Sequence, residues 1–172
     1  MAKKVQIFNN FLDQEVFLEI KKFIMSPRCQ WRYVNYIAHK DGRDNDNDGY
    51  FVHSFKDCHP QTFEDRYPES PHFPLIAKIL DKIKYQNILR IRSSLYPRRD
   101  VQKPDPFHID YDFPHKVCIF YVNTNNGYTM FENGEKIPSV ENQLATFDGN
   151  EKHCSVVQTD TSARYIVNIN IL

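Results

Sequence analysis

The apolar positions in the first half of the chain predict two helices. Residues 12–25 carry apolar side chains at three- and four-residue steps, namely Leu12, Val16, Phe17, Ile20, Phe23 and Ile24. Asp13 is placed to begin this helix as its N-cap. A second helix is predicted over residues 75–85, entered through Pro74, with its apolar face at Ile76, Ile79, Leu80 and Ile83.

Residues 31–55, between the two helices, read as two strands around a polar loop. Aromatic and β-branched side chains flank the loop on both sides. The loop itself, residues 40–49, is too polar to pack and is rich in turn-forming residues. This segment is therefore expected to be a hairpin whose tip stands away from the core.

The second half of the chain, from Asn87 onward, has the pattern of successive short strands. Each is rich in β-branched and aromatic residues and is bounded by Gly, Pro, Asn or Asp. Helices placed first in the sequence and strands placed after them predict a mainly β, α+β domain built on a sandwich or barrel. The predicted strands cover residues 88–96, 116–123, 128–131, 143–147, 154–157 and 164–172.

Composition and charge narrow the functional classes. Among the 172 residues, 22 Lys and Arg balance 22 Asp and Glu, so bulk charge gives no reason to expect a nucleic-acid or membrane partner. The four cysteines form no C-x-x-C pair, which favours free thiols in a reducing compartment. No apolar run reaches membrane-spanning length, and we expect a cytoplasmic protein whose oligomeric state is open.

A His-x-Asp tripeptide is the first candidate for chemistry. Side chains alternate along an extended chain, so His108 and Asp110 point the same way. They need a third ligand to hold a metal, and His153, after a predicted strand end and turn, is the best candidate. Two histidines and one carboxylate leave open positions on an octahedral metal, which is the pattern of non-haem Fe(II) oxygenases. A structural zinc site would close its coordination shell instead.

Arg164 adds a second requirement to this site. On the last predicted strand it shares a face with Ile166, Asn168 and Asn170, while the opposite face is almost wholly apolar. The apolar face should pack on another layer, so the face of Arg164 should line a wet cavity. A guanidinium in such a cavity is costly unless an anion pairs with it, and the distal carboxylate of 2-oxoglutarate is such an anion.

From Leu95 to the C-terminus the chain resembles the prolyl 4-hydroxylase-like branch of the Fe(II)/2-oxoglutarate dioxygenases. The resemblance implies a double-stranded β-helix, or jelly roll, with N-terminal helices packed on one sheet. One domain would span residues 1–172, with helices and a lid hairpin in 1–86 and the jelly-roll core in 87–172. The matching segments, in the family's order, are Leu95-Tyr96-Pro97, His108-Ile109-Asp110, 118–123, 143–147, His153 and Arg164.

The resemblance also implies a role for each matching residue. His108, Asp110 and His153 would bind the iron, and Arg164 would pair with the C5 carboxylate of 2-oxoglutarate. Tyr121 would donate its hydroxyl to the same carboxylate, with Tyr96 and Asn168 lining the pocket. The implied activity uses Fe(II), O2 and 2-oxoglutarate, with ascorbate as a further candidate cofactor. It would hydroxylate a peptide, such as a prolyl residue, or a small molecule, and release succinate and CO2.

Three features of the sequence allow other interpretations: the loop over 44–49, His115 and the jelly-roll pattern itself. Residues 44–49 fit the first half of an EF-hand loop, but Phe55 stands where the closing Glu is needed, and a substrate lid is favoured. His115 is expected to be a loop residue beside the site rather than a fourth ligand. The main rival is a non-catalytic, cupin-like metal- or ligand-binding jelly-roll module. Arg164 and Tyr121 argue against it, because neither has a role without a dicarboxylate.

Overall fold

The structure is a computed structural model that describes residues 5–36 and 49–172. It has two helices, α1 (Gln14–Ile24) and α2 (Phe73–Ala77), and a 3-10 helix over Leu80–Lys82. The strands are β1 (Gln6–Phe8), β2 (Arg32–Val34), β3 (Tyr50–Asp57), β4 (Ile88–Pro97), β5 (Lys116–Tyr121), β6 (Asn125–Phe131), β7 (Lys136–Ser139), β8 (Gln143–Asp148), β9 (His153–Val156) and β10 (Ala163–Ile171).

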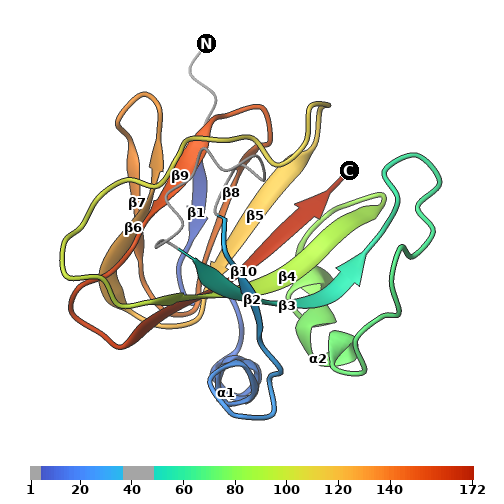
Figure 1. Cartoon of the computed structure of the whole chain (residues 1–172). Helices are drawn as coiled ribbons and strands as arrows, with labels where there is room; N and C mark the ends of the chain where they lie inside the picture. The colour runs from blue at the N-terminus through green and yellow to red at the C-terminus, as the bar shows by residue number, and fades with distance from the viewer. Residues whose placement is uncertain (1–4, 37–48) are drawn as a thin grey trace.

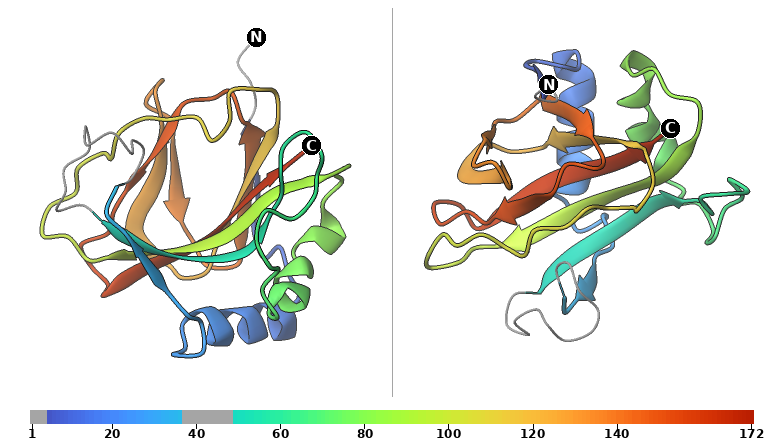
Figure 2. Two further views of the ribbon diagram at one scale, coloured as in Figure 1. Left: turned by 45° about the vertical axis from the view of Figure 1, so that its right-hand side comes forward. Right: turned by 90° about the horizontal axis from the view of Figure 1, so that it is seen from above.

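The strands form two antiparallel sheets. The larger sheet has seven strands in the order β1-β8-β5-β10-β4-β3-β2, and the smaller has three in the order β7-β6-β9. Figure 1 and the left view of Figure 2 show the helices on one face of the larger sheet and the smaller sheet over part of the other. The mainly β prediction is confirmed, and the candidate site lies on the side away from the helices.

The larger sheet buries a different apolar cluster on each face. On the helix side, Phe17 of α1 meets Phe120 of β5 edge to face, with ring centroids 6.2 Å apart. Val167 and Ile169 of β10 belong to the same buried cluster, while Ile166 belongs to the cluster on the other face. The alternation predicted for the last strand is therefore confirmed. Fully burying side chains of this size is worth about 1.5–3 kcal/mol each.

The two predicted helices differ from expectation in detail. Asp13 occupies the N-cap position of α1, but its side chain makes no capping hydrogen bond. The single helix predicted over 75–85 is wrong, because the chain forms the short α2 and then a 3-10 helix. The chain is wound more tightly here by hydrogen bonds between residues three positions apart. These run from Ile79 N to Ile76 O (3.0 Å) and from Ile83 N to Leu80 O (2.9 Å). Ile76, Ile79 and Leu80 are still buried, as the apolar pattern predicts.

The six strands predicted in the second half are all present, with small shifts at their ends. Two further strands, β1 and β7, were not predicted. All three residues of β1 are exposed, so burial leaves no alternating pattern in its sequence. Strand β7 carries Pro138 and sits at the edge of the smaller sheet, where proline is tolerated. The loop over residues 40–49 lies almost wholly outside the described residues, so the structure does not test the lid and calcium interpretations of it.

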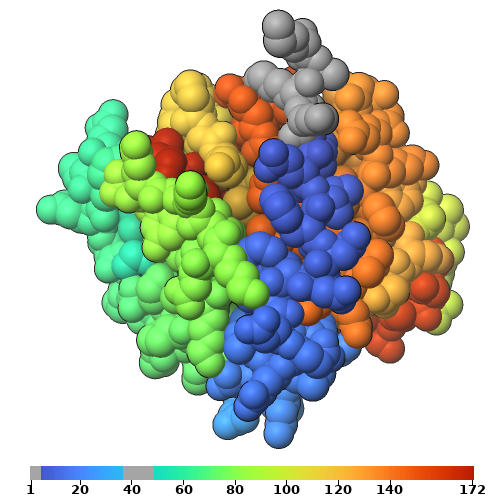
Figure 3. Space-filling model, turned by 180° about the vertical axis from the view of Figure 1, so that it is seen from behind, coloured from blue at the N-terminus to red at the C-terminus, as the bar shows by residue number. Residues whose placement is uncertain are grey.

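The segment before α1 is fastened across the back of the molecule. Figure 3 shows it between the region of α2 and β4 and the strands of the smaller sheet. The side chain of Asn142 accepts a hydrogen bond from Leu12 N (2.9 Å) and donates one to Leu12 O (2.8 Å). Within the described residues, no helix is long and apolar enough to cross a membrane.

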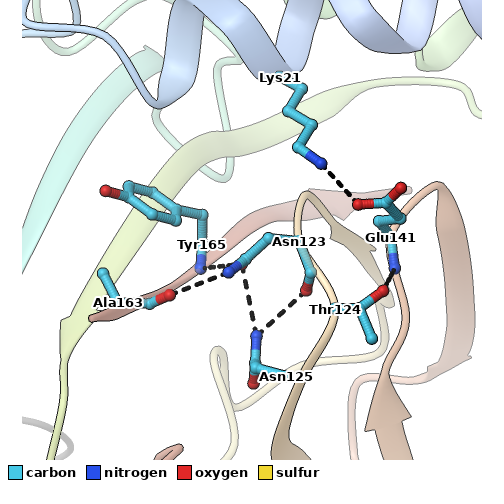
Figure 4. Close-up of polar contacts among 7 residues, drawn as sticks. All are labelled: Lys21, Asn123, Thr124, Asn125, Glu141, Ala163 and Tyr165. Carbon is cyan, nitrogen blue, oxygen red and sulfur yellow. Dashed lines mark hydrogen bonds and ion pairs between the residues drawn. The ribbon is translucent and has the colours of Figure 1, made fainter. Parts of the chain in front are cut away.

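A polar hub fixes the start of β10, close to the candidate site (Figure 4). Asn123 donates from Nδ2 to Ala163 O (2.9 Å) and accepts from Tyr165 N at 2.9 Å. The side chain of Asn125 donates to Asn123 O at 3.1 Å, which ties β6 to the same point. These contacts hold both chain neighbours of Arg164 by their backbones, so the position of Arg164 is set by the fold.

Candidate metal centre and its buried guanidinium

The three residues predicted to bind a metal come together. One ligand atom each from His108, Asp110 and His153 lies within 4.8 Å of the other two. His108 lies in extended chain outside the regular strands and forms an isolated antiparallel bridge with His153. Reciprocal backbone hydrogen bonds of 3.0 Å join the two residues. The extended backbone still places His108 and Asp110 on one side, because Ile109 between them points out and is exposed.

The histidine tautomers suit a metal. The Nδ1 atom of His108 lies 3.2 Å from Pro106 O, and Nδ1 of His153 lies 3.0 Å from Glu151 O. A carbonyl only accepts, so each Nδ1 carries the proton and each Nε2 has a free lone pair. The Nε2 atom of His153 is buried with no hydrogen-bond partner among the described residues. Burial lowers the pKa of His153 to about 4, which keeps the imidazole neutral as a metal ligand requires.

Asp110 is held as an oriented carboxylate. Arg90 donates from Nη2 to Oδ1 at 3.0 Å, and Asn170 donates from Nδ2 to Oδ2 at 2.8 Å. Asn168 approaches the same Oδ2 at 3.4 Å. Burial alone would raise the pKa of Asp110, but the charges of Arg90 and Arg92 hold it well below its ordinary value. Partners of this kind fix the direction in which a carboxylate offers its lone pairs to a metal.

Arg164 is fully buried and is surrounded by neutral groups. Its Nε donates to Ser139 Oγ at 2.7 Å, Nη2 donates to Thr129 Oγ1 at 3.2 Å, and Nη1 donates to Ser155 Oγ. No carboxylate among the described residues forms an ion pair with it. A buried charge without a counter-charge is costly, so this arrangement favours an anionic ligand.

Two tyrosines and a glycine complete the surroundings of the guanidinium. The Cζ atom of Arg164 lies 5.6 Å from the ring centre of Tyr96 and 5.7 Å from that of Tyr121. The Tyr121 hydroxyl donates to Thr129 Oγ1 at 2.9 Å, so Tyr121 and Arg164 meet at one hydroxyl. A Cβ atom at Gly127 would stand 2.9 Å from Arg164 Cδ, which explains why only glycine leaves room for this side chain.

Two cavities adjoin the candidate metal centre. The larger, of about 630 Å³, opens to solvent and reaches His108 and Asp110. The smaller, of about 30 Å³, lies between His153 and the Arg164 region and has Thr129 and Ser155 in its wall. Both cavities share the lining residues Tyr50, Arg92 and His108.

Several other charged and titratable residues lie around the candidate metal centre. His115 is buried nearby, but it does not belong to the cluster of metal-ligating atoms found among the described residues. Arg99 pairs with the buried Asp105 at 2.6 Å. Sequence reasoning missed Arg90 and Arg92. The polar residues at every second position of β4 were the available signal, because they share one face with Tyr96.

Comparison with known proteins supports the fold. No model of a known protein family and no curated protein matches the sequence. An oxidoreductase of the 2OG-Fe(II) oxygenase family from Burkholderia pseudomallei is similar in structure, with a TM-score of 0.67 and 11% identity over 97% of this chain and 84% of that one.

Two prolyl hydroxylases are also similar. The viral collagen prolyl hydroxylase of Paramecium bursaria Chlorella virus-1, solved with 2OG, has a TM-score of 0.59 and 14% identity over 99% of this chain and 98% of that one. The Trichoplax adhaerens prolyl hydroxylase, solved with a hypoxia inducible factor peptide fragment, has a TM-score of 0.64 and 14% identity over 99% and 84%. At these identities the likeness shows a common fold. The expected resemblance to prolyl 4-hydroxylase-like oxygenases is confirmed at that level, and with it the jelly roll.

Proposed function

We propose that this protein is a 2-oxoglutarate-dependent Fe(II) dioxygenase that hydroxylates a prime substrate and releases succinate and CO2. The observation that carries the proposal is that a cluster of metal-ligating side chains and the buried Arg164 lie close to the same small cavity. Two imidazoles and an oriented carboxylate converge, and a buried guanidinium without a carboxylate partner lies beyond them. The first feature suits Fe(II), and the second suits the far carboxylate of a dicarboxylic acid.

Each residue then has a defined task. The Nε2 atoms of His108 and His153 and the carboxylate of Asp110 would hold the iron. Arg164 and the Tyr121 hydroxyl would bind the C5 carboxylate of 2-oxoglutarate, with Tyr96 and Asn168 at the sides of the pocket. When bound, the iron supplies oxygen activation coupled to oxidative decarboxylation of 2-oxoglutarate. Arg90 and Asn170 keep the Asp110 carboxylate aimed at the iron, because each occupies one of its oxygens.

The prime substrate is proposed to occupy the larger cavity. That cavity reaches His108 and Asp110 and, at about 630 Å³, falls within the range usual for small-molecule sites. One structural neighbour was solved with a peptide fragment, which makes a peptide substrate a reasonable proposal for this chain as well. A hydrogen atom to be replaced by hydroxyl would have to face the site of the iron from this side.

The experiment is an anaerobic titration with Fe(II) and 2-oxoglutarate, followed through the metal-to-ligand charge-transfer absorbance. The wild type should bind one Fe(II) per chain and develop the band with 2-oxoglutarate. His108→Ala and His153→Ala should lose both, and His59→Ala, whose ring only accepts hydrogen bonds from a local turn, should keep both. Fe(II) binding with no band would instead support the non-catalytic, cupin-like module.

A further inference from the structure

Arg92 is a cation for which the proposed activity has no use. It lies on β4 and lines both cavities beside the candidate metal centre. Its register partners are Asn168 on β10 and Ser54 on β3, so its side chain shares the face that carries Tyr96 and Arg90. Arg92 therefore stands where the large cavity meets the proposed 2-oxoglutarate pocket.

No described residue accepts a hydrogen bond from the Arg92 guanidinium. Its Nε is buried and unpartnered, and no ion pair joins it to a carboxylate of the described chain. The Asp110 carboxylate attracts Arg92 but is hydrogen-bonded to Arg90, and the centre of the Tyr50 ring lies 6.0 Å from Arg92 Cζ. A cation–π contact at that distance is weak and leaves the N–H donors of the guanidinium unused.

Of the other arginines and lysines that line the large cavity, three are already paired and the fourth, Arg32, is exposed to solvent. Arg66 binds Asp57 at 2.8 Å, Lys56 binds Glu69 at 2.7 Å, and Arg90 binds Asp110 at 3.0 Å. The two acids that line this cavity, Asp57 and Asp110, are therefore already paired and leave no carboxylate for Arg92. A divalent metal at the candidate centre would add positive charge, and a 2-oxoglutarate dianion paired with Arg164 would not reverse the excess. The cavity consequently favours an anion beside Arg92.

We propose that the prime substrate carries a carboxylate, which Arg92 binds next to the candidate metal centre. A planar guanidinium matches a carboxylate with two parallel N–H···O bonds, so it fixes orientation as well as position. The substrate class would be a small carboxylic acid or a chain ending in a free carboxylate, and an internal peptide unit would lack the anchoring group. This inference rests on the proposed function, because it places the carboxylate relative to the atom that is oxidised.

The test compares carboxylates with their neutral amides. Acetate, benzoate and N-acetyl-L-proline would each be titrated against acetamide, benzamide and N-acetyl-L-prolinamide by calorimetry. The protein would be saturated with Fe(II) and 2-oxoglutarate under anaerobic conditions, so that Arg164 is already engaged. In the wild type we expect at least one acid to bind about ten- to a hundredfold more tightly than its amide, as a charged hydrogen bond implies.

Variants assign the preference to Arg92. Arg92→Met keeps the length of the stem and should bring the acid-to-amide ratio close to one, and Arg92→Lys should keep part of the preference because it retains the charge. Arg28→Met, an exposed arginine away from the cavity, should leave the ratio unchanged. Equal binding of acids and amides in the wild type, or an undiminished preference in Arg92→Met, would overturn the inference.

A second readout separates this inference from the proposed function. The charge-transfer band should form in Arg92→Met at wild-type concentrations of 2-oxoglutarate. A large rise in the 2-oxoglutarate requirement, without any change in the acid-to-amide ratio, would assign Arg92 to the co-substrate and overturn the inference alone. If the wild type gave no band, the proposed function would fail, and the acid-to-amide comparison in unloaded protein would still decide whether Arg92 binds carboxylates.

Discussion

Arg164 is fully buried, and all the side chains that accept hydrogen bonds from it are hydroxyl groups. Arg164→Ala should raise the 2-oxoglutarate concentration needed for half-saturation about ten- to more than a hundredfold, since a charged hydrogen bond contributes about 1.5–3 kcal/mol. Arg164→Lys should lose less, because it keeps the charge but not the planar fork. The measurement is the anaerobic charge-transfer titration.

Fe(II) affinity is the internal control for that prediction. Arg164 lies outside the cluster of metal-ligating atoms, so neither substitution should change the binding of Fe(II). Arg28→Ala, at an exposed arginine that lines neither cavity, should match the wild type in both measurements. If Arg164→Ala bound 2-oxoglutarate as tightly as the wild type, the assignment of this guanidinium to the co-substrate would be wrong.

Asn170 and Asn168 offer a graded test of how Asp110 is oriented. Asn170 donates to Asp110 Oδ2 at 2.8 Å, whereas Asn168 approaches the same oxygen at 3.4 Å. Asn170→Ala should weaken Fe(II) binding about tenfold or more, the usual effect of losing a partner behind a metal ligand. Asn168→Ala should have a smaller effect on Fe(II) because its bond is long. Competition with a metal-sensitive dye would measure both, and the reverse order would contradict the proposed support of Asp110.

At the scale of elements, the Asn142 side chain adds to the backbone pairing that joins the beginning of the chain to the larger sheet. Asn142 makes two buried hydrogen bonds to the backbone of Leu12 and has a positive φ of 55°. Asn142→Ala should lower the free energy of unfolding by about 2–4 kcal/mol, because two backbone groups lose their partners and alanine tolerates this φ less well.

Chemical denaturation would measure the effect of Asn142→Ala. Asn133→Ala is the matched control, because Asn133 is exposed and bonds only to the nearby Glu135 N. Asn133→Ala should lower the free energy of unfolding by about 0.5 kcal/mol or less, as is usual for surface positions. Equal costs for the two variants would show that the contact between Asn142 and Leu12 does not fasten the N-terminal segment.

The elements also show which features a sequence can reveal. The periodicity of α1 and the alternation of β10 were both predicted, because α1 buries one apolar face and β10 has an apolar face opposite a largely polar one. Strand β1 buries no side chain, so backbone pairing with β8 alone creates it and leaves no pattern to read. The single helix over 75–85 was a wrong prediction for a related reason, since apolar spacing does not distinguish an α-helix from short α and 3-10 turns.

Some residues of the candidate site could be predicted from the sequence and others could not. His108, Asp110, His153 and Arg164 were found because their chemistry is unusual for the pattern around them. Arg90 was not, since a lone arginine on a strand is common on protein surfaces and its ion pair with Asp110 spans 20 positions of sequence. Contacts of that kind follow from strand order, and strand order was not predicted.

For the whole molecule, buried thiols predict sensitivity to alkali. Burial raises the pKa of Cys29 to about 11 and those of Cys118 and Cys154 to about 12. Above pH 9, the ordinary value, the unfolded chain loses these protons while the folded chain keeps them, so stability is complete below pH 9 and falls as pH rises further. Each thiol should lower the free energy of unfolding by about 1.4 kcal/mol per pH unit in that window.

Denaturation midpoints between pH 8 and 10.5 would measure this slope. Cys118→Val removes one fully buried thiol without opening a cavity, so its stability should decline less steeply than that of the wild type. Tyr96, whose pKa burial raises to about 12, adds to the loss only above pH 10 and is present in both proteins. Parallel slopes for the two proteins would contradict the assignment to Cys118.

Strand β10 lies in the middle of the larger sheet, between β5 and β4, yet every other described strand precedes it in the chain. During translation the groups β1-β8-β5 and β4-β3-β2 therefore leave the ribosome before the strand that joins them. Until then β4 and β5 present unpaired edges, and Arg164, Asn168 and Asn170 do not yet exist. A message cut short before residue 163 would yield a chain with two open sheet edges and no buried guanidinium, which is a substrate for chaperones and proteases rather than a partly working protein.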